Sequence, residues 1–99
     1  MESTNAISCL SALAHEGRLN VFRKLVQASP EGLAVGELAS CCCLSIGTVS
    51  AQLSVLSSSG LISGHRNGRS ISYRVNFDEV GDLLGFLMKD CCGGRHFSD

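Results

Sequence analysis

The chain of 99 residues lacks any apolar run that approaches the about 20 residues of a transmembrane helix. Its opening, MESTNAISCL, has no basic stretch followed by an apolar core, so we expect no secretory signal. No nucleophile–base–orienter set and no phosphate loop indicates an enzyme. There is also no internal repeat or low-complexity linker. We therefore expect one non-enzymatic domain over residues 1–99 in the cytoplasm, with 91–99 as a flexible C-terminal tail.

Acidic residues are missing from one long segment. The formal net charge of the chain is only -1, yet no Asp or Glu lies between Leu38 and Phe77. Arg66, Arg69 and Arg74 all fall in this segment and give it a charge of +3. A local basic face on an otherwise neutral protein indicates an anionic partner, and nucleic acid is one such partner.

Hydrophobic spacing predicts a mainly α-helical fold with a small β-hairpin. Apolar residues recur at helical spacing in several segments, and an Asn67-Gly68 pair favours a two-residue hairpin turn between alternating strands. The order is therefore ααααββα, which is typical of a winged helix-turn-helix. The expected helices are 5–14, 16–28, 35–42, 45–57 and 78–90.

The helix at 45–57 is the expected DNA-reading helix. Ser45 is a good N-cap, and one stripe is predicted to be buried, consisting of Ile46, Val49, Leu53 and Leu56. The other face is small and polar, and the hairpin carries arginines at its tip. A second helix of this kind enters the major groove while the wing reaches phosphates. The predicted DNA contacts are Ser45, Gly47, Thr48, Ser50 and Gln52 on the helix, with Arg66, Asn67 and Arg69 on the wing.

Three stretches together carry a family resemblance. They are ALAHEGRLNVFRKLV, GELASCCCLSIGTVSAQLSVLSSSGLI and RNGRSISYRV. In this order they resemble the ArsR (SmtB/ArsR-type) family of dimeric metal- and metalloid-sensing repressors, over roughly residues 10–88. The resemblance implies a homodimer that binds an inverted repeat in operator DNA and leaves when an inducer binds. It also implies that DNA binding requires no cofactor.

The chain departs from the family pattern at three places. The usual Arg-His pair of the reading helix falls at Ala51 and Gln52, although the Gln52 amide has the groups to read adenine. The family's glycine between the two helices falls at Cys43. The stretch that matches the family's Cys-Val-Cys arsenic site has Ala34 and Gly36 instead of cysteines, so that site is absent.

Six cysteines lie in clusters rather than in the spread pattern of a disulfide framework. In a subset of the family, a C-terminal cysteine pair and a third cysteine bind arsenite. Cys91 and Cys92 match that pair, while Ser98 stands at the third position and is a poor ligand for a soft ion. Cys9 is a candidate third ligand. The expected inducer is arsenite or methylarsenite, with antimonite as a further candidate.

Other interpretations remain open. Cys41, Cys42 and Cys43 fit buried or turn-filling roles. Alternatively they form a second metal site, or a thiol-based redox or persulfide sensor that works with Cys9 or the C-terminal pair. A winged-helix module without a DNA target is more distant. We expect the first and last helices to form the dimer interface, because the apolar stripe from Val80 to Met88 is wider than a small core needs.

Overall fold

The elements follow the predicted order, with one addition. The structure is a computed structural model that describes residues 1–89. The predicted order of four helices, two strands and a last helix is confirmed. The elements are α1 (Ser3–Leu13), α2 (Glu16–Gln27), β1 (Leu33–Ala34), α3 (Val35–Cys42), α4 (Ile46–Ser58), β2 (Ile62–Asn67), β3 (Ser70–Val75) and α5 (Phe77–Met88).

The additional element is β1, which the sequence did not predict. It pairs antiparallel with β3 through Leu33 opposite Tyr73 and Ala34 opposite Ser72. The sheet therefore has three strands in the order β1-β3-β2. A strand of two residues has no alternating pattern to detect, because its pairing arises only from the fold. Its effect is to anchor the wing to the start of α3.

The helix-turn-helix is formed by α3 and α4. Their axes bend by 111° at the turn, within the range typical of this motif. Among residues 1–89, no single helix is long and apolar enough to cross a membrane, and α3 with α4 passes the length and composition test only as this bent pair. The core takes Leu38 from α3 and Val49, Leu53 and Leu56 from α4. The largest fully buried side chains are Leu25, Leu38, Leu53, Leu56, Leu61 and Ile62.

The inner face of α1 is formed by small residues. Helical spacing puts Ile7, Leu10 and Ala14 on one face, which hydrophobicity alone would assign to the core. Instead α1 buries its small residues, Ala6, Cys9 and Ala12. Ile7 and Leu10 are exposed. Small side chains on the inner face allow close packing of α1, so the large apolar residues are left pointing away from the core.

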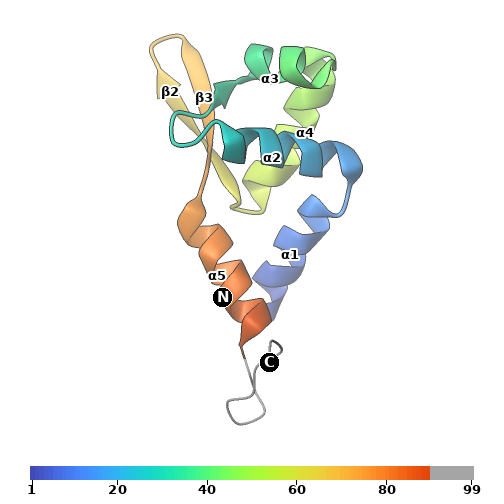
Figure 1. Ribbon diagram of the computed structural model, residues 1–99, viewed down its shortest axis with the longest axis vertical. Helices are drawn as coiled ribbons and strands as arrows, with labels where there is room; N and C mark the ends of the chain where they lie inside the picture. Colours follow the sequence, from blue (N-terminus) through green and yellow to red (C-terminus); the bar gives the residue numbers. More distant parts are fainter. Residues whose placement is uncertain (90–99) are drawn as a thin grey trace.

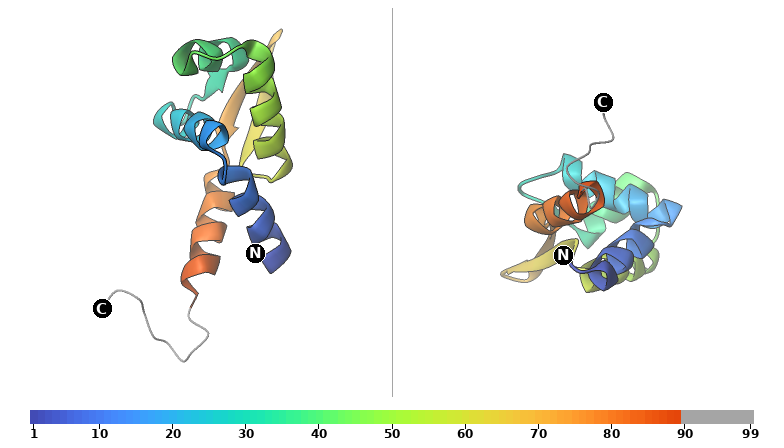
Figure 2. Two further views of the ribbon diagram at one scale, coloured as in Figure 1. Left: turned by 90° about the vertical axis from the view of Figure 1, so that its right-hand side faces the viewer. Right: turned by 90° about the horizontal axis from the view of Figure 1, so that it is seen from below.

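The molecule has two distinct ends (Figure 1). The wing tip and the junction of α3 with α4 lie at one end, whereas α1 and α5 extend at the other. A side view shows the same separation, with α1 and α5 projecting from the helix-turn-helix body (Figure 2). Arg18 joins α1 to this body, because its guanidinium donates hydrogen bonds to the carbonyl oxygens of Ala12 at 2.7 Å and Ser11 at 3.2 Å.

Candidate nucleic-acid interface

The start of α4 is fixed by its predicted cap. The hydroxyl of Ser45 accepts a hydrogen bond from the backbone N–H of Thr48 at 3.1 Å. The same hydroxyl donates to the Thr48 hydroxyl oxygen at 2.9 Å. An N-cap of this kind is worth about 1 kcal/mol of helix stability. Ser45 and Thr48 therefore brace each other at the end of α4 that lies beside the helix-turn-helix junction.

One side of α4 packs into the core. Val49, Leu53 and Leu56 are buried, as the spacing predicted. The prediction for Ile46 was wrong, because this side chain is 57% exposed. Ile46 is the first residue of α4, and the helix here extends beyond the residues that would cover it. The helical period predicts which way a side chain points from the helix. It does not predict where along the helix the core ends.

The opposite side of α4 is open to solvent and carries only short side chains. Gly47 has no heavy atom within 4 Å of the position that a Cβ would occupy. No long side chain shields the backbone of the first turns, so a partner surface can approach α4 closely. The exposed residues are Ser45, Gly47, Thr48, Ser50, Ala51 and Ser54.

Gln52 lies at the border of this open face, next to α2. Its side chain is partly buried, and its Oε1 is buried without a hydrogen-bond partner. The amide packs against α2, where a Cβ on Gly17 would clash with the Gln52 Nε2 atom. Glycine at position 17 therefore leaves the space that Gln52 fills. In this structure Gln52 connects α4 to α2, and its carbonyl oxygen is not presented for reading a base.

The wing turns one residue later than predicted. Asn67 pairs with Ser70 across the hairpin, which leaves Gly68 and Arg69 as the two-residue turn. Gly68 has a positive φ of 67°. A positive φ at the first turn position alone is the pattern of a type II′ turn, which favours glycine there. Arg69 is thus at the tip. Arg66, Asn67 and Arg69 are all exposed.

A small polar network fixes the base of the wing. The Asn76 side chain donates to the Gly60 carbonyl oxygen at 2.8 Å and accepts from the Ser63 hydroxyl at 2.9 Å. The Ser63 oxygen also lies 3.0 Å from His65 Nε2. Gly60 lies two residues after the end of α4, so this network ties the hairpin to the end of the reading helix. The base of the wing is therefore held at the end of α4 by hydrogen bonds.

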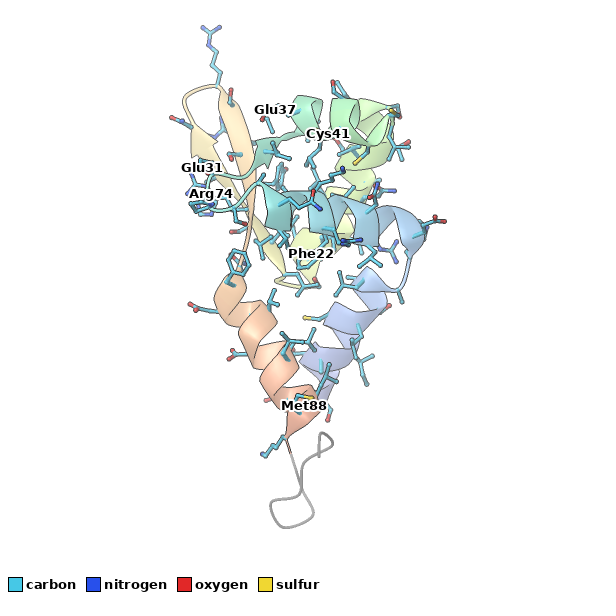
Figure 3. All side chains as sticks on the ribbon, viewed as in Figure 1. Phe22, Glu31, Glu37, Cys41, Arg74 and Met88 are labelled. Atoms are coloured by element: carbon cyan, nitrogen blue, oxygen red, sulfur yellow. The ribbon has the colours of Figure 1, made fainter. Side chains whose placement is uncertain are left out.

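Acidic side chains lie outside α4 and the wing; Glu31, before β1, and Glu37, on α3, are labelled in Figure 3. The acid-free segment from Leu38 to Phe77 includes α4 and the whole wing, and it carries the charge of +3 noted above. His15 and Arg18, at the start of α2, border the same side of α4 and line a shallow groove with Thr48 and Gln52. Sequence reasoning missed this border, because only the packing of α2 on α4 reveals it.

Cys9 is enclosed by the fold. It is fully buried, and its thiol donates to the Ser59 carbonyl oxygen at 3.4 Å. Burial raises the pKa of the Cys9 thiol, and the nearby Glu79 carboxylate raises it further. Because a soft metal ion binds the thiolate form, this environment opposes the role of third ligand that was predicted for Cys9.

The three adjacent cysteines differ in exposure. Cys41 and Cys43 are exposed, whereas Cys42 is partly buried against the core. Burial raises the pKa of the Cys42 thiol; the Cys41 and Cys43 thiols add to the rise, and Lys24 opposes it. Cys43 ends α3 in the left-handed conformation, with φ 56° and ψ 43°. Residue 43 thus has the backbone conformation that glycine adopts most easily.

The predicted inducer thiols lie outside the described residues. Cys91 and Cys92 follow α5, which ends at Met88, by only a few positions. Within residues 1–89, no group of three or more His, Cys, Asp or Glu side chains is arranged to hold a metal ion. The cysteines from 41 to 43 therefore do not form such a centre together with other ligands of this part of the chain.

Known proteins share this helix-turn-helix with the chain. A helix-turn-helix domain family matches residues 13–65, which is more than half of the chain. A homodimeric winged helix-turn-helix DNA-binding domain from Mycobacterium bovis, described as a possible ArsR-family transcriptional regulator, is similar at 30% identity. It has a TM-score of 0.71, with 85% of this chain and 75% of that chain covered. The chain belongs to the ArsR family of transcriptional regulators.

Two further solved structures agree with this membership. NolR from Sinorhizobium fredii is 36% identical, with a TM-score of 0.69 and coverage of 86% of this chain and 82% of that chain. A possible transcriptional regulator for arsenical resistance is 26% identical, with a TM-score of 0.69 and coverage of 81% and 80%. No curated protein sequence matches the chain significantly. The ArsR fold is a winged helix-turn-helix, so the predicted fold class is confirmed.

Proposed function

We propose that this ArsR-family regulator is a cytoplasmic homodimeric repressor that binds an inverted repeat in operator DNA and releases it when a trivalent arsenical binds Cys91 and Cys92. The observation that carries the DNA-binding part is the shared location of two features. The open, short-chained face of α4 and the arginine-tipped wing lie at the same end of the molecule (Figure 1). No acidic residue interrupts the segment that forms them.

The expected DNA complex follows from this end of the molecule. The first turns of α4 lie in the major groove, where Ser45, Thr48 and Ser50 supply short hydrogen bonds. Arg66 and Arg69 bind phosphates beside that groove. Only a few cationic side chains are available, so we expect a shallow salt dependence, with a slope of about 0.9 for each phosphate contacted.

The dimer part of the proposal rests on the opposite end of the molecule. Here α1 and α5 leave large apolar side chains uncovered in the single chain. Leu84, for example, is 56% exposed. Burial against a second copy would remove this apolar area from water at a gain of about 25 cal/mol per Å². It would also set two reading helices about 34 Å apart, one turn of DNA. The exposed residues are Ile7, Leu10, Leu84, Leu87 and Met88.

The inducer part rests on chemistry and on position in the sequence. Two adjacent thiols suit a trivalent arsenical, because soft sulfur ligands favour soft ions. Cys91 and Cys92 follow closely on α5, which carries much of the proposed dimer interface. Binding there would alter the spacing of the reading helices, for which a coupling of about 1–3 kcal/mol is sufficient. One similar structure is described as a possible regulator for arsenical resistance.

Titration of the reduced protein with a fluorescent duplex from its own promoter region tests the proposal. We expect specific binding, followed by release when arsenite, methylarsenite or antimonite is added. The double variant Cys91→Ser/Cys92→Ser should bind DNA normally and resist release. As a matched control, Cys41→Ser/Cys43→Ser should respond like the unaltered protein. Equal release from the two double variants would reject the C-terminal pair as the inducer site.

A second candidate is a thiol-based redox or persulfide sensor on the same scaffold. The observation in its favour is the exposure of Cys41 and Cys43 directly before the DNA-reading helix. Treatment with peroxide, persulfide and arsenite in separate reactions, followed by peptide mass spectrometry, distinguishes the two candidates. Modification at Cys41 or Cys43 that releases DNA, together with no response to arsenicals, would favour the redox sensor.

A further inference from the structure

The side chain of Ile46 has no evident partner within the described chain. It begins α4 and is 57% exposed, although the helical period places it near the buried stripe. The end of the molecule that carries the start of α4 lies away from α1 and α5 (Figure 1). A second copy that pairs through α1 and α5 would therefore leave Ile46 uncovered.

Ile46 projects from the start of α4 because the side chains around it are small. Gly47 has no side chain, and the Ser45 and Thr48 hydroxyls are bonded to each other at 2.9 Å. Farther along, the open face offers Ser50, Ala51, Ser54 and Val55. Gln52, the one long polar side chain nearby, is packed against Gly17. Ile46 is thus the largest exposed side chain in the first turns of the reading helix.

The chemistry of this surface limits what it can recognise in a DNA groove. An isoleucine side chain has no donor or acceptor, so it cannot match the hydrogen-bonding edge of any base. The major groove presents one apolar group that differs between base pairs, the C5-methyl group of thymine. An exposed isoleucine set against a phosphate or a polar base edge would instead leave those groups without partners.

We propose that Ile46 reads a thymine through its C5-methyl group, so that sequence preference at this position of each half-site arises from apolar contact. This inference rests on the proposed DNA binding and specifies how the start of α4 discriminates bases. The short side chains around Ile46 allow the backbone of α4 to approach closely enough for such contact. Ser45 and Thr48 supply polar contacts beside it.

Uracil substitution provides a direct test, because uracil differs from thymine only in lacking the C5-methyl group. Duplexes that bind the reduced protein are first selected from a random pool, and each thymine of the bound half-site is then replaced in turn. One position should lose about fourfold in affinity per half-site, equivalent to about 0.8 kcal/mol for one buried methyl group. Fluorescence anisotropy at fixed salt measures this loss.

Two variants assign the effect to Ile46. Ile46→Ala should bind more weakly and should lose its sensitivity to uracil at that position. Val55→Ala is the matched control, because Val55 is also an exposed apolar residue of α4 but lies more than two turns later. It should keep the full sensitivity. Thermal unfolding of each variant, expected to be close to that of the unaltered protein, checks that the fold is retained.

The outcomes distinguish a failure of this inference from a failure of the proposed DNA binding. Enrichment of duplexes whose binding is unchanged by uracil would overturn the inference and leave the proposed DNA binding intact. Equal uracil sensitivity in Ile46→Ala and the unaltered protein would also overturn it, since another side chain would then read the methyl group. Failure to enrich any duplex would contradict the DNA-binding function itself, and this inference with it.

Discussion

Replacing Gln52 with methionine tests whether this side chain reads DNA or supports the fold. Methionine has nearly the same length and shape as glutamine but no buried acceptor. Gln52 Oε1 is buried without a partner, and an unsatisfied buried polar group costs about 1–3 kcal/mol. Because Gln52 is only partly buried, we expect Gln52→Met to stabilise the protein by about 1 kcal/mol, near the lower limit of that range.

Thermal unfolding at fixed protein concentration measures this gain, since dimerisation makes Tm depend on concentration. A gain of this size raises Tm by about 4–8 °C for a domain of this length. Gln27→Met is the matched control, because Gln27 is exposed and its amide is hydrated, so no gain is expected. Destabilisation by Gln52→Met would refute the structural role of Gln52 with a buried, unpaired Oε1. Unchanged stability together with loss of an adenine preference in the selected duplexes would refute it as well.

Three further predictions concern the turn, the interface and the wing. Cys43→Gly should stabilise the fold by about 0.5–1 kcal/mol because it relieves a left-handed non-glycine residue; urea unfolding should show the opposite sign for Cys41→Gly, which lies within α3. Leu84→Glu should give a folded monomer by sedimentation, and a persistent dimer would locate the interface elsewhere. Arg69→Ala should reduce the salt slope of DNA binding by about 1.8 per dimer, and an unchanged slope would remove Arg69 from the phosphate contacts.

Much of the fold could be predicted because local signals were strong. The spacing of Val49, Leu53 and Leu56 predicted the buried stripe of α4, and Ser45 predicted its start. The hairpin was also predicted, although its turn lies at Gly68 and Arg69 rather than at Asn67 and Gly68. Pairing register is decided by both strands together, so a single dipeptide signal can be displaced by one residue.

The candidate site was less predictable, because its details depend on contacts between elements. Ile46 shares the period of the buried stripe but lies beyond the core. Gln52 turns toward α2 because Gly17 leaves space there, and nothing local to α4 reveals this. Ile7 and Leu10 have the composition of core residues, yet they face outward on α1. Periodicity cannot distinguish a face that packs inside one chain from a face suited to a second chain.

The most direct test of the central claim, that the open face of α4 binds DNA, is the affinity of Ala51→Glu for the promoter duplex. Ala51 is exposed on this face, and glutamate is a good helix former, so the fold should be retained while a negative charge meets the phosphates. Gln27→Glu adds the same charge on α2 as a control. We expect Ala51→Glu to lose at least about tenfold in affinity, or about 1.4 kcal/mol, while the control keeps normal binding. Unchanged affinity in a correctly folded Ala51→Glu would contradict the account.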